Sequence, residues 1–77
     1  MTVNIMLFGQ LCDITGTDAI VLENIVDTDR LIDILQRSYP ALIHSKYVIA
    51  VDKNIVSENT LLPNNSTVAL LPPFSGG

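Results

Sequence analysis

The residues best suited to chemistry stand at the end of the sequence, where Pro72-Pro73 is followed by Phe74, Ser75 and Gly76-Gly77. Proline has no backbone N–H and therefore ends a strand, and two prolines in a row favour an extended exit from the body of the protein. Gly76-Gly77 has no side chains and can follow backbone paths that are closed to other residues. We therefore expect residues 72–77 to form a flexible tail that can thread a narrow channel.

The reactive group of such a tail is the carboxylate of Gly77. An unperturbed C-terminal carboxyl group has a pKa of about 3.5, so it is ionised at neutral pH and is a poor electrophile. It must therefore be activated. The sequence has no Gly-x-x-x-x-Gly-Lys phosphate-binding loop and only four Lys and Arg residues, so we expect no ATP site in this chain. The activating enzyme is expected to be a separate partner.

The composition limits the classes of function. With 77 residues we expect a single domain over residues 1–77, and the 48% hydrophobic content predicts a dense core together with apolar surface for a partner. The formal net charge of −4 argues against nucleic-acid binding and favours a basic protein partner. The opening residues match neither a signal peptide nor a membrane span, which predicts a cytoplasmic location.

Two extended apolar runs open the chain. In residues 3–8 the odd positions form one apolar face, while Met6 and Phe8 make the second face apolar as well. This pattern predicts a central strand that is covered on both sides, or one whose second face meets a partner. Residues 10–15 are expected to form a helical turn, and a second strand is expected at residues 19–22.

One long helix is expected over residues 28–39. Asp27 or Thr28 supplies its N-cap, leucine and isoleucine recur at helical spacing, and Pro40 ends it. The expected order along the chain is two strands, this helix and then two or three more strands. This order predicts an α+β domain, with one helix packed across a mixed sheet of four to five strands. This order is that of the ubiquitin-like β-grasp. The later apolar stretches are residues 47–51, 55–56 and 67–71.

Several pieces of the chain carry a family likeness, and together they cover most of it. They are Leu7-Phe8-Gly9-Gln10, Gly16, Val48-Ile49-Ala50-Val51-Asp52 and the stretch from Val68 to Gly77. The most specific piece is an apolar strand followed by Pro-Pro-x-Ser-Gly-Gly. With these pieces the chain resembles the small, sulfur-carrying subunits of molybdopterin synthase, within the wider group of ubiquitin-like sulfur carriers.

The resemblance implies that Gly77 is adenylated at its carboxylate by an adenylyltransferase similar to ubiquitin-activating enzymes, which uses ATP. Gly77 would then become a thiocarboxylate, 1-thioglycine, with Gly76 part of the same working end. The sulfur would pass, inside a large catalytic subunit, to cyclic pyranopterin monophosphate and form the molybdopterin dithiolene in molybdenum cofactor biosynthesis. The chain would be a non-catalytic, sulfur-donating subunit that binds no cofactor or metal, in a two-plus-two heterotetramer.

The resemblance also implies an apolar surface that docks on the large subunit. Carried over by position, it predicts Phe8, Ile55 and Leu71 as partner-binding residues, for which ordinary core packing is the alternative. Among the tail residues, Pro72-Pro73 and Phe74-Ser75 are expected to be recognised by the enzyme that binds the tail. The alternative for Phe74-Ser75 is that they cover the edge of the sheet.

The other candidate groups are given ordinary roles. Cys12 is the only cysteine, so there is no internal disulfide, C-x-x-C redox pair or structural zinc site, and we expect a small, buried or half-buried hydrophobe. His44 is expected to be a solvated loop residue without a second ligand nearby. Lys46 and Lys53 are expected to be solvated, since neither has the apolar surroundings that would make it a base.

Three other functions stay open. A carrier for thiamin thiazole synthesis would share the fold and the Gly-Gly ending, although Pro72-Pro73 and the extra length favour molybdopterin. A ubiquitin-like modifier would be joined to lysines of other proteins through Gly77. A plain interaction module with an inert tail would be unaffected by the loss of Gly76-Gly77.

Overall fold

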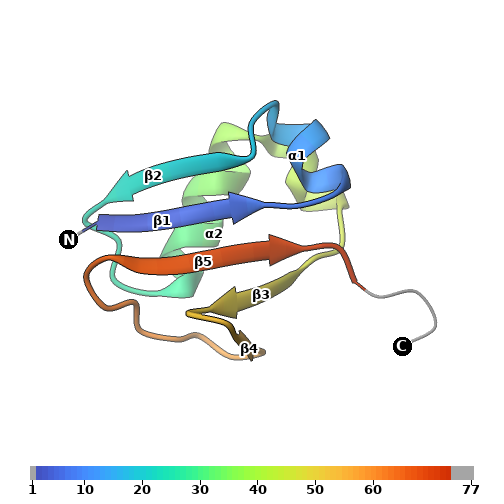
Figure 1. Ribbon diagram of the computed structural model, residues 1–77. Coiled ribbons are helices and arrows are strands. Elements are labelled where there is room, and N and C mark those ends of the chain that lie inside the picture. The colour runs from blue at the N-terminus through green and yellow to red at the C-terminus, as the bar shows by residue number, and fades with distance from the viewer. Residues whose placement is uncertain (1, 74–77) are drawn as a thin grey trace.

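The structure of the protein is a computed structural model that describes residues 2–73. Five strands, two α-helices and one 3-10 helix make up this part of the chain (Figure 1). In chain order they are β1 (Thr2–Leu7), α1 (Gln10–Thr15), β2 (Ala19–Glu23), α2 (Thr28–Ser38), η1 (Pro40–His44), β3 (Val48–Val51), β4 (Asn54–Val56) and β5 (Ser66–Leu71).

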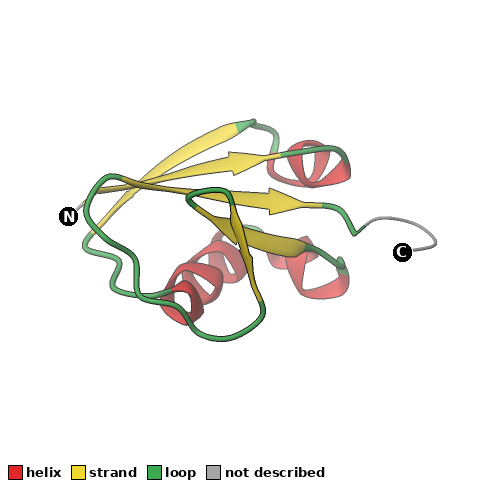
Figure 2. Ribbon diagram, turned by 60° about the horizontal axis from the view of Figure 1, so that its bottom comes forward, coloured by secondary structure: helices red, strands yellow, loops and turns green. Residues whose placement is uncertain are grey.

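The five strands form one mixed sheet in the order β2-β1-β5-β3-β4. The first and last strands, β1 and β5, lie side by side and parallel at its centre, and the other neighbouring pairs are antiparallel (Figure 1). The long helix α2 crosses one side of the sheet, and η1 lies on that side too (Figure 2). The predicted α+β, ubiquitin-like β-grasp arrangement with one main helix is therefore confirmed.

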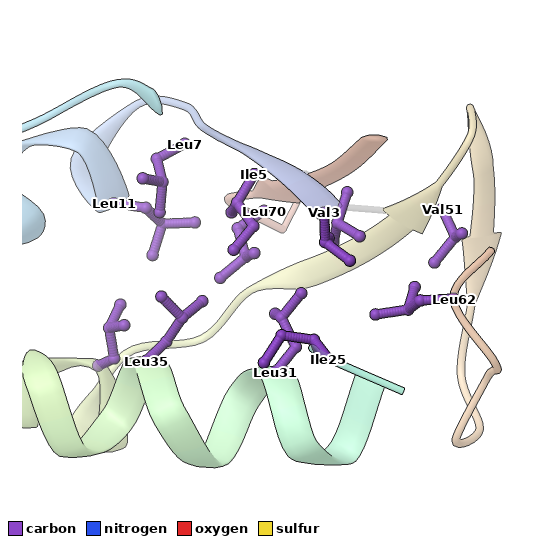
Figure 3. Close-up of a cluster of buried hydrophobic side chains, with 12 residues drawn as sticks. Val3, Ile5, Leu7, Leu11, Ile25, Leu31, Leu35, Val51, Leu62 and Leu70 are labelled. Carbon is purple, nitrogen blue, oxygen red and sulfur yellow. The ribbon is translucent and has the colours of Figure 1, made fainter. Parts of the chain in front are cut away.

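The core lies between the sheet and α2. Strand β1 alternates, so Val3, Ile5 and Leu7 all point to this side and are nearly inaccessible to solvent. Leu31 and Leu35 point back at them from α2, one turn apart (Figure 3). Each fully buried side chain of this size contributes about 2 kcal/mol through the hydrophobic effect. The cluster consists of Val3, Ile5, Leu7, Leu11, Ile25, Leu31, Leu35, Leu42, Val51, Leu62, Val68 and Leu70.

The start of α2 is fixed by side chains. Of the two predicted N-caps the structure uses Asp27, whose carboxylate accepts a hydrogen bond of 2.9 Å from the Arg30 N–H. Asn59 Oδ1 accepts the Asp29 N–H at 2.9 Å, and the Thr60 carbonyl accepts the Thr28 N–H at 2.9 Å. The first amides of α2 are thus satisfied by the chain itself. The same bonds hold the loop of residues 57–62 against the helix.

Besides shifts of one residue at the ends of the strands, which leave Phe8 outside β1, two details differ from the expectations. The long helix ends at Ser38, one residue earlier than expected, and the segment after it is the 3-10 helix η1 rather than a loop. Leu42 fixes η1 by entering the core. Such short 3-10 segments carry no hydrophobic period that could be recognised in the sequence. Among residues 2–73 no helix is long and apolar enough to cross a membrane.

Candidate functional site

The side of the sheet that faces away from α2, here called the outer face, is largely apolar. The strand register places Met6 beside Ala69, Ala69 beside Ala50, and Ala50 beside Ile55, so these side chains form one row across four strands. Alternation along each strand puts them opposite the core. Within the strands the outer face comprises Thr2, Asn4, Met6, Ala19, Val21, Glu23, Val48, Ala50, Ile55, Thr67, Ala69 and Leu71, and we include Phe8, which directly follows β1 and lines the hollow described next.

A hollow of about 380 Å³ opens on this face. Its position follows from side-chain size, because the small Ala50 and Ala69 lie between larger neighbours, Met6 and Phe8 among them. The volume is at the lower end of the range for ligand pockets, which begins at about 300 Å³. Its lining is mostly apolar, with two charged residues. The lining residues are Met6, Phe8, Ala50, Asp52, Lys53, Thr67 and Ala69.

The structure places the three predicted partner-binding residues at or beside this hollow. Phe8 is 40% exposed and Ile55 is 64% exposed, so ordinary core packing, the alternative for both, is wrong. Leu71 is half-buried at the end of β5, with Val48 of β3 beside it. Phe8 lines the hollow, whereas Ile55 and Leu71 lie outside its lining. Their role in binding a partner stays a prediction.

Some outer-face residues escaped the sequence reasoning. The sequence pattern did point to Met6, because this residue makes the second face of its strand apolar, and in the structure Met6 is 43% exposed. The pattern gave no indication of Ala50 and Ala69, since alanine is common in both buried and exposed positions. Their small side chains matter because they leave room for the hollow. Their contribution depends on the register between β3 and β5, which local sequence does not reveal.

The tail leaves the body at the end of β5. The Phe8 N–H donates to the Leu70 carbonyl at 3.1 Å, which ties the end of β1 to the end of β5. Gly9 has a positive φ of +58°, and a Cβ built on it would lie 3.0 Å from Pro72 Cγ. Pro72 is thus packed against a residue that has no side chain. The parallel pairing of β1 and β5 brings Phe8 and the tail exit to the same end of the sheet (Figure 1).

The remaining predicted site residues belong to this tail or lie apart from it. Pro73 is exposed, and residues 74–77, with the predicted working group on Gly77, lie outside the described residues. Cys12 is half-buried on α1, and His44 is exposed at the end of η1. Between residues 2 and 73 no three His, Cys, Asp or Glu side chains gather so that they could hold a metal ion. The described residues therefore form a largely apolar face, with Pro72 and Pro73 following β5 at one end of the sheet.

Comparison with known families gives a match to the ThiS family over residues 5–77. Among curated proteins, the chain is similar to the molybdopterin synthase sulfur carrier subunit of Mycobacterium tuberculosis. The two are 35% identical over 80 aligned residues, which cover 97% of this chain and 96% of that protein.

Solved structures extend the similarity to the fold. The small archaeal modifier protein 1 of Methanosarcina acetivorans superposes with a TM-score of 0.83 at 25% identity, covering 99% of this chain and 96% of that one. A chain of the complex between subunits 1 and 2 of molybdopterin-converting factor from Helicobacter pylori gives a TM-score of 0.75 at 25% identity, with 100% of both chains covered.

Proposed function

This chain belongs to the ThiS family and is a sulfur carrier of the ubiquitin-like type, and from this premise we propose that it is the sulfur carrier subunit of a molybdopterin synthase. Its working group is the carboxylate of Gly77. The folded body binds partners and presents this group, while the catalytic side chains belong to the larger subunit. The identity of 35% to a curated molybdopterin synthase subunit, over nearly the whole of both chains, supports this choice.

The chemistry at Gly77 has three steps. An adenylyltransferase joins the carboxylate to the AMP part of ATP and releases pyrophosphate, which turns a poor electrophile into an activated acyl group. A donor that supplies sulfur at the oxidation level of sulfide attacks the acyl carbon, AMP leaves, and a thiocarboxylate is formed. In the large subunit, the thiocarboxylate sulfur then bonds to a carbon of cyclic pyranopterin monophosphate as a C–O bond of that carbon breaks and its oxygen substituent leaves. Water cleaves the resulting thioester, which restores the Gly77 carboxylate and leaves a thiol on the pterin. Two such transfers supply the two sulfurs of the dithiolene.

The observation that carries the proposal is the position of the tail exit beside an uncovered apolar face. A carrier must be held by its body while its end reaches into an enzyme, and both needs are met at one end of this sheet. Phe8 lies at that end, lines the hollow and is bonded to β5 one residue before its last. The Helicobacter pylori relative is described as a complex of two subunits, which supports the large subunit as the docking partner.

A second candidate function is protein modification. The structural similarity to the small archaeal modifier protein 1, at a TM-score of 0.83, favours it specifically. In that case the activated Gly77 is attacked by a lysine Nζ of another protein and an isopeptide bond forms. The activation step is common to both functions. The acceptor, sulfur or lysine, distinguishes them.

Mass spectrometry of the intact chain tests the proposal. The chain is incubated with its adenylyltransferase, ATP and a sulfur donor, and the C-terminal peptide is then fragmented. We expect a mass gain equal to the replacement of one oxygen by sulfur, located at Gly77. A matched variant with one alanine added after Gly77 keeps its fold and stays unmodified. Lysine conjugates without any thiocarboxylate would favour the modifier instead, and modification of the extended variant would contradict the terminal-carboxylate mechanism.

A further inference from the structure

The turn that joins β3 to β4 contains an unfavourably placed lysine. Asp52 and Lys53 alone connect the two antiparallel strands, with φ values of +48° and +74°. A two-residue hairpin turn with both φ values positive is of type I′, and its preferred sequences are Asn-Gly and Asp-Gly. Asp52 suits the first position. Lys53 occupies the second, where glycine would avoid the steric cost of the left-handed conformation.

The rest of the structure explains Asp52 but not Lys53. The Asp52 carboxylate accepts the Thr67 N–H at 2.9 Å, and the Asp52 N–H donates to the Thr67 carbonyl at 2.8 Å, so the turn is fastened to β5. Lys53 has no hydrogen bond or ion pair with any residue between 2 and 73. A residue that keeps a costly backbone conformation without a hydrogen bond or ion pair to the described fold points to a use for its side chain.

The position of Lys53 suggests that use. Its side chain is exposed and lines the apolar hollow of the outer face, together with Met6 and Phe8. The two arginines of the chain, Arg30 and Arg37, both pair with Asp33 on α2, on the other side of the sheet. Lys46, the remaining cation of the described part, does not line the hollow. Lys53 is therefore the positive charge next to the apolar pocket, in a chain whose net charge is −4.

We infer that Lys53 determines partner specificity on the outer face. The hollow receives a large apolar side chain of the large subunit, and the Lys53 ammonium group pairs with a carboxylate that lies next to that side chain. This inference rests on the proposed function, which supplies the large subunit as the occupant. Filling the hollow expels water from around the pair, and the lower local dielectric strengthens the attraction.

The pair adds specificity because it differs in sign from most of the surface. An acidic chain attracts basic patches of any partner, whereas Lys53 is attracted only to a partner that has a carboxylate at one defined place. A partner docked in another register brings either no charge or a positive charge to Lys53. Lys53 would then lose water without gaining a partner, or be repelled. The correct large subunit is selected by the combination of an apolar side chain and a neighbouring carboxylate.

Titration calorimetry with the purified large subunit tests the inference, using the whole chain. Lys53→Gly removes the charge and relieves the turn, so it should raise the thermal midpoint by a few degrees and yet weaken binding about fivefold. Lys53→Glu should weaken binding by more than about tenfold, because repulsion replaces attraction. Lys46→Glu is the control with the same change of charge away from the hollow, and its affinity should stay within about twofold of wild type.

The outcomes separate the two proposals. If the wild-type chain binds the large subunit and Lys53→Gly binds equally well, the role of Lys53 is overturned while the docking function stands. If Lys53→Gly lowers the thermal midpoint, the lysine serves the fold and the inference also falls. If the wild-type chain does not bind the large subunit at all, the proposed function fails, and this inference fails with it. A loss for Lys53→Glu that disappears at high salt supports an ionic contact.

Discussion

At the scale of single residues, one buried hydroxyl group stands out. Ser66 begins β5, is 2% exposed and lies beside Val3, yet its Oγ has no hydrogen-bond partner among residues 2–73. Leaving a buried polar group unpaired costs about 1–3 kcal/mol. The backbone of Ser66 is nevertheless well placed, since its N–H donates to the Pro63 carbonyl at 3.1 Å. We therefore expect the hydroxyl to weaken a fold that the backbone at the same position supports.

We expect Ser66→Ala to raise the free energy of unfolding by about 1 kcal/mol, because it removes the unpaired hydroxyl and leaves the backbone unchanged. Urea unfolding measures this value. Ser57→Ala is the control, since Ser57 is exposed, and it should shift stability by less than about 0.5 kcal/mol. A loss of stability in Ser66→Ala would show that the hydroxyl has a partner in solution.

Gly9 and Gly16 offer a matched pair at the same scale. Both have positive φ values, +58° and +75°, but a Cβ at Gly9 would meet Pro72 at 3.0 Å, whereas Gly16 has nothing within 4 Å. We expect Gly16→Ala to cost about 1 kcal/mol from backbone strain alone, and Gly9→Ala to cost about 2–3 kcal/mol. Chemical denaturation of both variants checks the order. Gly9 also has a ψ of −135°, outside the left-handed helical region in which Gly16 lies with a ψ of 10°. Equal losses would therefore mean that neither the contact with Pro72 nor this backbone conformation adds a penalty.

At the scale of elements, the sequence predicted most strands and the long helix, because alternation, an N-cap and Pro40 are local signals. It could not predict how the strands pair. The central pair joins β1 to β5, whose partners Ile5 and Val68 are far apart in the chain. The outer face, and with it the hollow, exists only after this pairing. The predicted site residues Phe8 and Ile55 were therefore named by resemblance, while Ala50 and Ala69 were missed.

The loop of residues 57–62 shows how an element without regular structure is fixed. Thr28 is buried, its Oγ1 accepts the Thr60 N–H at 2.9 Å, and it bonds Asn59 Oδ1 at 3.3 Å. Leu62, at the end of the loop, enters the core and donates its N–H to the Val26 carbonyl. The loop is therefore held to the start of α2 by the Thr28 hydroxyl group and the Asn59 side chain as well as by backbone bonds.

We expect Thr28→Val, which keeps the shape of the side chain, to lower the free energy of unfolding by about 1–3 kcal/mol, because the Thr60 N–H loses its acceptor in a part-buried site. Amide hydrogen exchange by NMR should show faster exchange at Thr60. Thr60→Val is the control, since its hydroxyl bonds only the Glu58 carbonyl at an exposed position, and it should cost less than about 1 kcal/mol. Equal losses would contradict the special role of Thr28.

At the scale of the whole molecule, the sheet separates the core from the surface for which we propose docking. The core occupies the side that faces α2, and the outer face keeps Met6, Phe8, Val21 and Ile55 at least 40% exposed. Monomeric proteins rarely leave a contiguous apolar surface of this kind without a partner. A change on the outer face should therefore affect association far more than folding.

Phe8→Asp tests this separation. Phe8 is 40% exposed and does not belong to the core cluster, so we expect the variant to lose less than about 1 kcal/mol of stability, a loss that thermal unfolding measures. The same variant should bind the large subunit at least about 30-fold more weakly, because a charge is buried without a partner where an aromatic side chain had been. Surface plasmon resonance with the immobilised large subunit measures this affinity.

Ile43→Asp is the control, because Ile43 is 58% exposed but lies on η1, on the side of α2. If both variants bind equally well, the docking surface is not the outer face; if Ile43→Asp alone loses binding, the large subunit docks on the helical side, and the hollow needs another occupant.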